Sequence, residues 1–136
     1  MNKKIFVAIA AIAAVAIIAG YALIVPALNT ALAQQTSTKQ YTLTITKHRF
    51  AFEKEEFLNM SAGSWSFTIT NVSGTVKGIV ILLINHEKPR DGFIWFKFNP
   101  TIGDSTTVNL TNGNYTLKIL IYGTLNSTLT VTVAYP

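Results

Sequence analysis

The chain has 136 residues, a formal net charge of +5 and no cysteine. Without cysteine, thiol catalysis, iron–sulfur ligation and copper sites that need a thiolate are excluded. The Lys and Arg residues are scattered along the sequence, so we expect no nucleic-acid-binding patch.

The first element is an uncharged apolar run at residues 5–25. At about 1.5 Å per residue, a helix of this length spans the roughly 30 Å hydrocarbon layer of a bilayer. Lys3 and Lys4 precede it, which predicts a cytoplasmic N-terminus and a single-pass cell-membrane protein with everything after Val25 outside. The alternative is a signal peptide, because the small-residue triplet at 31–33 suits cleavage before Gln34.

Small residues cover much of this predicted helix, Ala10 and Ala14 among them. Because lipid is as apolar as Leu, helices associate in membranes through the close packing that small residues permit. We therefore expect the helix to pack against the transmembrane helices of a partner. The alternative is a simple Ala-rich export signal.

Residues 26–39 form a polar connector, and the sequence from residue 40 to 136 predicts one β domain. Turn signals separate the predicted strands, which favours a Greek-key β-sandwich. Trp65 and Phe67 alternate with Ser and Thr and are expected in the core, whereas the nearly all-apolar run at 76–84 predicts a strand covered on both faces. The expected strands are 41–46, 65–70, 76–84, 93–98, 108–110, 115–121 and 129–133.

Few side chains in the sequence suggest chemistry. His48 and His86 lack neighbours at metal-ligand spacing, and we interpret both as surface residues. Three glutamates at 53, 55 and 56 are interpreted as a solvated turn. The sequence contains no nucleophile elbow and no phosphate-binding loop, and we identify no catalytic constellation in it.

The aromatic run at 93–98 has more hydrophobic side chains than one strand face needs. Core packing is one interpretation. The other is that one side of this strand, with Trp95 as the candidate residue, faces a partner subunit or the bilayer surface.

Five N-x-[ST] sequons lie near predicted turns or strand ends, and they favour an exported glycoprotein. The alternative is chance, because Thr and Asn are abundant. The candidate glycosylation sites are Asn59, Asn71, Asn109, Asn114 and Asn126.

Residues 46–71 resemble the opening of a cupredoxin domain of the cytochrome oxidase subunit II type. Phe50 and Phe52 match the aromatic pair of that family, Ala62-Gly63 its turn, and Thr70-Asn71 its strand end. Gly113-Asn114-Tyr115 and the final strand at 129–133 resemble the end of the domain.

The resemblance also implies that this chain lacks the copper ligands of the family. Lys77 stands where the family has its first copper-binding His, and residues 117–125 hold none of the Cys, His and Met ligands. A cupredoxin-like domain without copper resembles subunit II of quinol oxidases. It implies a membrane-anchored, non-catalytic subunit of a respiratory haem–copper quinol oxidase, with the catalytic subunit as its partner and no cofactor or metal bound by this chain.

Two rival functions stay open. The protein could be a glycosylated subunit of an extracellular archaeal filament that assembles by strand donation, with residues 35–45 as the donated strand. It could also be an anchored surface protein with another binding role. The fold alone does not choose among these functions.

Overall fold

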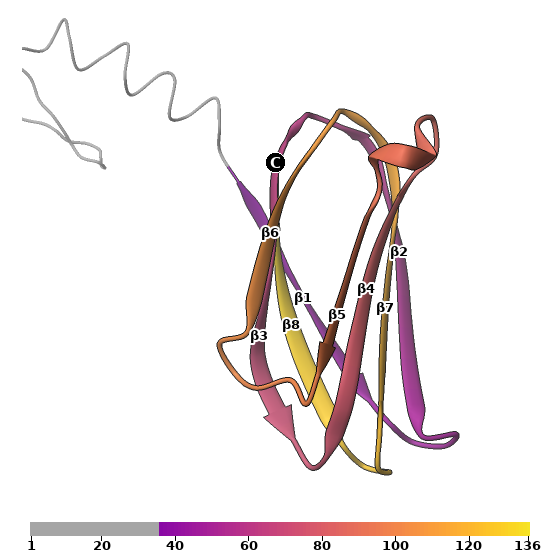
Figure 1. The fold of residues 1–136 in the computed structure, drawn as a ribbon, viewed down its shortest axis with the longest axis vertical. Helices are drawn as coiled ribbons and strands as arrows, with labels where there is room; N and C mark the ends of the chain where they lie inside the picture. Colours follow the sequence, from indigo (N-terminus) through magenta and orange to yellow (C-terminus); the bar gives the residue numbers. More distant parts are fainter. Residues whose placement is uncertain (1–35) are drawn as a thin grey trace, which may run out of the picture. The chain divides into compact units, whose positions relative to one another are not determined.

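The computed structural model describes residues 36–136, which form two four-stranded antiparallel sheets (Figure 1). A single 3-10 turn, η1 (Pro89–Asp91), connects β4 to β5. The first sheet, in spatial order, contains β1 (Ser37–Thr44), β8 (Thr128–Tyr135), β3 (Gly63–Ser73) and β6 (Ser105–Leu110). The second contains β2 (Phe50–Met60), β7 (Gly113–Gly123), β4 (Val76–Asn85) and β5 (Phe93–Phe98).

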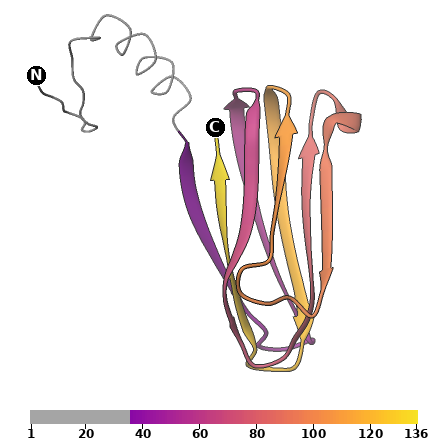
Figure 2. The ribbon, with the colours of Figure 1, turned by 60° about the vertical axis from the view of Figure 1, so that its left-hand side comes forward.

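The strands pair in a nested order. β1 pairs with β8, β2 with β7, β3 with β6, and β4 with β5. Residues 36–136 therefore pair like the two arms of one long hairpin, and these arms fold into two layers. This is the jelly-roll arrangement of two Greek keys. Figure 2 shows the two layers from a second direction. The predicted all-β sandwich is confirmed.

The core lies between the two sheets. Trp65 and Phe67 of β3 are fully buried, as the sequence predicts, and face Ile81 and other inner residues of the second sheet. One end of the core is aromatic: the Trp65 ring lies 5.2 Å from Phe57 and 5.8 Å from Tyr115, centroid to centroid. Such aromatic pairs add about 0.5–1.5 kcal/mol each beyond the burial of their area.

The glutamates at 53, 55 and 56 lie in β2, so the predicted solvated turn is wrong. β2 is one of the two edge strands of the second sheet and pairs only with β7. An edge strand tolerates charged side chains because its open side remains in water, and such charges also discourage pairing with other chains. The charge-rich sequence therefore concealed a strand of eleven residues.

β4 is less covered than the sequence predicts. Its inner residues, such as Ile79 and Ile81, are fully buried, but Val80 and Leu82 on the outer side are only half-buried. Within residues 36–136, no further element covers this outer side. The apolar run at 76–84 is therefore covered on one face, not on both.

Part of the predicted domain organisation can be compared with the structure. β1 begins at Ser37, so the last three residues of the predicted connector belong to the β domain. Among residues 36–136, no helix is long and apolar enough to cross a membrane. The predicted membrane segment at 5–25, with Ala10 and Ala14, lies outside the described residues.

Truncating Phe67 to Ala should reduce the free energy of unfolding by about 3–5 kcal/mol, because this large ring is fully buried between the sheets. Urea unfolding followed by tryptophan fluorescence would measure the change. The matched control is Thr107→Ala on the exposed side of β6, which should change the free energy by about 0.5 kcal/mol or less. Equal unfolding midpoints for the two variants would contradict this placement of Phe67.

Candidate functional site

The outer side of the second sheet is apolar over most of its area. Strand registers align its side chains in rows that cross β2, β7, β4 and β5 in that order. We call the apolar side chains of three successive rows the outer apolar face. The rows are Phe50, Tyr122, Gly78 and Phe98; then Phe52, Leu120, Val80 and Phe96; then Lys54, Lys118, Leu82 and Ile94.

The outer apolar face has the size of a binding surface. Five of its large side chains are 47–65% exposed, namely Phe50, Phe52, Ile94, Phe96 and Phe98. Because such side chains have roughly 150–250 Å² of surface, these five leave roughly 500 Å² of apolar surface in water. The largest apolar patch on a typical monomer is roughly 300–600 Å² and is often functional. The half-buried side chains between the five make the patch continuous.

The outer side of the first sheet has the opposite chemistry. It presents hydroxyl and amide groups and no charged side chain in its central rows, and its threonines bond across strands. Thr42 bonds Thr130 at 2.9 Å, and Thr44 bonds Thr128 at 3.1 Å. β-branched threonines suit a strand whose side chains face water. Only one of the two outer sides is therefore built as an ordinary solvent-facing surface.

Trp95, the candidate interface residue, does not belong to the outer apolar face. It is half-buried and packs against the core from the inner side of β5. The alternation of the strand instead places Ile94, Phe96 and Phe98 outside, and the Phe96 and Phe98 rings lie 4.4 Å apart. The sequence carried this signal, because a strand whose odd residues face inward must present its even residues outward.

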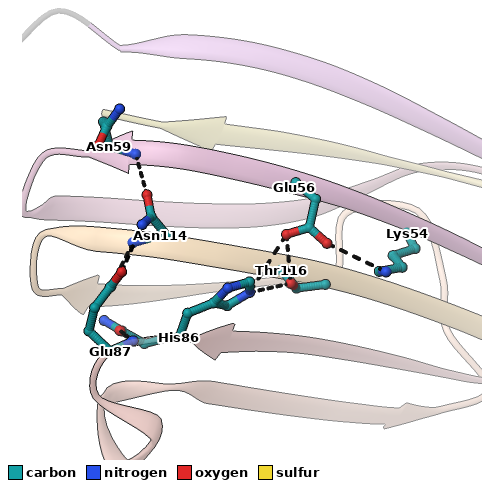
Figure 3. A network of polar contacts seen from close by, with 8 residues as sticks. Lys54, Glu56, Asn59, His86, Glu87, Asn114 and Thr116 are labelled. Atoms are coloured by element: carbon teal, nitrogen blue, oxygen red, sulfur yellow. Dashed lines mark hydrogen bonds and ion pairs between the residues drawn. The ribbon is translucent and has the colours of Figure 1, made fainter.

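A polar corner borders the outer apolar face at the end that carries η1 (Figure 3). Thr116 is its centre: the Oγ1 hydroxyl donates to Glu56 Oε1 at 2.9 Å. The hydroxyl has only one hydrogen, which it donates to Glu56. In its hydrogen bond with His86 Nε2, at 2.6 Å, Thr116 Oγ1 is therefore the acceptor and Nε2–H the donor. The Thr116 hydrogen points to a carboxylate and not to the histidine, so this trio is not arranged as a nucleophile with its base.

The other half of the polar corner joins two hairpin ends through Asn114. The Asn114 backbone N–H and side-chain amide donate to the Glu87 carboxylate at 3.0 and 2.7 Å, and its Oδ1 accepts from the Asn59 backbone N–H at 2.7 Å. The backbone N–H of Asn114, assisted by the side-chain amide, lowers the pKa of Glu87. Buried Asn85 shapes the following turn by accepting from two backbone N–H groups.

A third polar group lies on the open rim between β1 and β2. Lys39 pairs with Glu55, and the Tyr41 hydroxyl donates to the same carboxylate at 2.9 Å. Burial raises the pKa of Glu55, but the hydrogen bonds from Lys39 and Tyr41 outweigh it and leave the pKa below its usual value. Because these partners come from both sheets, we interpret the contact as structural.

No group of three His, Cys, Asp or Glu side chains that could hold a metal occurs among residues 36–136. His48 and His86 are both exposed, and the β1–β2 and β4–β5 connections that contain them lie at opposite ends of the sandwich (Figure 1). His86 belongs to the polar corner, and His48 lies in the loop between β1 and β2.

The structure distinguishes among the predicted glycosylation sites. Asn114 is half-buried, and its amide nitrogen is engaged by Glu87, so a glycan on that nitrogen would displace the Glu87 carboxylate. The other four sites are exposed, namely Asn59, Asn71, Asn109 and Asn126. Glycosylation itself stays a prediction.

Comparison with known proteins assigns no family to this chain. No protein-family model matches the chain, and no curated protein sequence matches it. One solved structure with some similarity is described as "Structural basis for the promiscuous specificity of the carbohydrate-binding modules from the beta-sandwich super family". It has 13% sequence identity and a TM-score of 0.40, and the match covers 73% of this chain and 54% of that chain. A similarity of this size assigns no ligand to the protein.

The pKa of Glu87 tests the polar corner. Its pKa is lowered from about 4.5, so its contribution to stability is present above the ordinary value and is lost as the pH falls through the lowered one. A ¹³C NMR titration of the Glu87 carboxyl should therefore give a midpoint below 4.5. Asn114→Ala should move the midpoint part of the way back, because the backbone N–H remains. Asn112→Ala, on the adjacent exposed turn, is the control, and an ordinary midpoint in the unmodified protein would refute the network.

Proposed function

We propose that this protein is a non-catalytic accessory subunit that docks through the outer apolar face onto an apolar surface of a membrane-bound partner. The observation that carries the proposal is the row of aromatic side chains on a sheet that no other described element covers. A free sandwich would be expected to place polar residues there, as the outer side of the first sheet does.

The composition of this surface supports docking on a protein. Interface cores are enriched in aromatic side chains and depleted of charged ones, and the outer apolar face has this pattern. A standard interface buries about 800 Å² on each partner. The roughly 500 Å² exposed by its five largest side chains would therefore supply most of an interface core. Lys54 and Lys118, directly opposite each other, would lie on its rim and suit an acidic neighbour.

The specific form of the proposal is a subunit II-like component of a respiratory haem–copper quinol oxidase. It is supported by the resemblance to copper-free cupredoxin-like domains and by the predicted membrane segment, which would hold the β domain near the outer bilayer surface. In this proposal the domain caps the catalytic subunit, and electrons do not pass through this chain.

One observation favours the filament as a second candidate. β1 nearly coincides with the predicted donor segment at 35–45, and it is an edge strand that pairs only with β8. The buried residues Tyr41 and Leu43 of β1, and Ile45 directly after it, belong to the core. A strand with this position could equally be supplied by another copy of the chain, which is how strand donation works.

Purification of the tagged full-length chain from membranes of its native host in mild detergent tests the proposal. We expect a haem protein to co-purify in stoichiometric amount, with quinol-oxidising activity and a haem signal in the reduced-minus-oxidised spectrum. Phe96→Glu should abolish co-purification, because it puts a charge into the apolar contact. Phe96 is 47% exposed, so the variant should still fold.

The matched control is Thr107→Glu, an exposed position on the edge strand β6 of the other sheet. It adds the same charge and should leave the complex intact. Polymers without haem would contradict the oxidase role and favour the filament. A haem complex that tolerates Phe96→Glu as well as Thr107→Glu would contradict docking through the outer apolar face.

A further inference from the structure

A pocket of about 280 Å³ lies at the end of the outer apolar face opposite the polar corner. Its walls include the three cationic or basic side chains of His48, Arg49 and Lys77 and the aromatic rings of Phe50 and Tyr122. We call it the basic pocket. Its volume is close to the lower end of the roughly 300–1,000 Å³ of small-molecule sites.

The backbone brings Arg49 to this pocket in an uncommon conformation. Arg49 has φ 66°, in the left-handed region that side chains other than Gly, Asn and Asp seldom adopt. Its carbonyl accepts a hydrogen bond from the Gly123 N–H at 2.9 Å, which ties the loop between β1 and β2 to the end of β7. Strained backbone of this kind gathers at functional sites.

Lys77 reaches the same pocket through an irregularity in β4. Val76 pairs with Gly123 and Gly78 pairs with Tyr122, so Lys77 is the extra residue of a bulge. Its carbonyl accepts from the Asn99 N–H at 3.0 Å. Bulges redirect side chains and are common beside binding sites.

The aromatic wall depends on Gly78. A Cβ atom at this position would lie 2.3 Å from Tyr122 Cε1, so the tyrosine ring rests directly on the glycine backbone. Tyr122 and Phe50 also form the first row of the outer apolar face. The basic pocket and the outer apolar face are therefore one continuous surface, cationic at its end and apolar along its length.

The positive charge of this pocket is not neutralised by the protein. All six Asp and Glu residues of the chain lie within residues 36–136, and none of them is within ion-pair distance of His48, Arg49 or Lys77. Neighbouring cations without a carboxylate repel one another, and an anion from outside would relieve that repulsion.

We propose that the basic pocket binds the phosphate group of an anionic phospholipid, with its acyl chains against Phe50 and Tyr122 at the end of the outer apolar face, which leaves the rest of that face to the docking partner. Arg and Lys side chains are the residues that hold phosphate in proteins. A ligand that is anionic at one end and apolar along its length matches the order of the chemistry on this surface. This inference goes beyond the proposed docking function, since it assigns a ligand to the chain itself.

The chain length outside the structure is consistent with this lipid. Eleven residues separate the end of the predicted membrane segment at Val25 from Ser37, and they reach at most about 40 Å. If residues 5–25 span the membrane as predicted, a connector of this length would allow the β domain to reach the bilayer surface. This one step rests on the proposed membrane attachment, whereas the chemistry of the pocket does not.

Titration calorimetry of the full-length chain in neutral maltoside micelles tests the inference with three probes. They are dihexanoyl phosphatidic acid, dihexanoyl phosphatidylcholine and inorganic phosphate. We expect phosphatidic acid to bind at least about tenfold more tightly than either of the others, because it alone offers both an unscreened anion and an apolar tail. The double variant Arg49→Asn with Lys77→Gln should lose this preference, and Asn tolerates the left-handed backbone at 49.

The matched control is Lys88→Gln with Arg90→Gln, which removes the same charge from exposed positions at the other end of the sandwich. It should bind as the unmodified protein does, and near-UV circular dichroism would verify that both variants are folded. Equal binding of phosphatidic acid to the two double variants would overturn the site. Inorganic phosphate binding as tightly as phosphatidic acid would overturn the lipid assignment. Because calorimetry needs no oxidase or filament, the result is independent of the proposed docking partner.

Discussion

Strand alternation is the constraint on which this molecule depends. In an antiparallel sandwich, every second side chain points between the sheets, and the others must face water or a partner. The inner residues of all the strands except β5 form one buried core cluster, and partly buried residues of β5 pack against it. Nothing in the stability of the sandwich requires Phe52, Phe96 and Phe98 on the outside. The proposed docking would account for their presence there.

The contrast between the two outer sides follows from the same constraint. Both sheets have edge strands and similar lengths, yet one side presents threonine hydroxyls and the other presents aromatic rings. Burying roughly 500 Å² of apolar surface is worth about 12 kcal/mol before the costs of association are subtracted. An exposed patch of that size favours aggregation in a protein that has no partner for it. This surface is therefore the part of the sandwich on which the proposed assembly depends.

The sequence predicts this fold best where alternation is clean. Trp65 and Phe67 alternate with Ser and Thr, and both are buried as expected. β2 was missed because its glutamates lower strand propensity, and only pairing with β7 makes it a strand. The prediction that the run at 76–84 is covered on both faces is wrong. A sequence does not distinguish an apolar residue on an uncovered face from an apolar residue in a core.

The candidate site was partly visible in the sequence. The excess of aromatic residues at 93–98 predicts that one side of this strand faces a partner, with Trp95 as the candidate, whereas β5 presents Phe96 outward and Trp95 toward the core. The basic pocket could not have been predicted, because His48, Arg49 and Lys77 meet only through a left-handed residue and a bulge. Neither feature has a reliable signal in a single sequence.

If docking occurs as proposed, the outer apolar face is covered when the protein functions. The chain has no cysteine, so single-cysteine variants can be labelled without background. Phe96→Cys and Thr107→Cys sit on edge strands of the two sheets and would be treated with a membrane-impermeant maleimide on intact cells of the native host. We expect the residue-96 variant to be protected on cells and to react like the residue-107 variant once the protein is purified in detergent. Equal labelling of both variants on intact cells would contradict it.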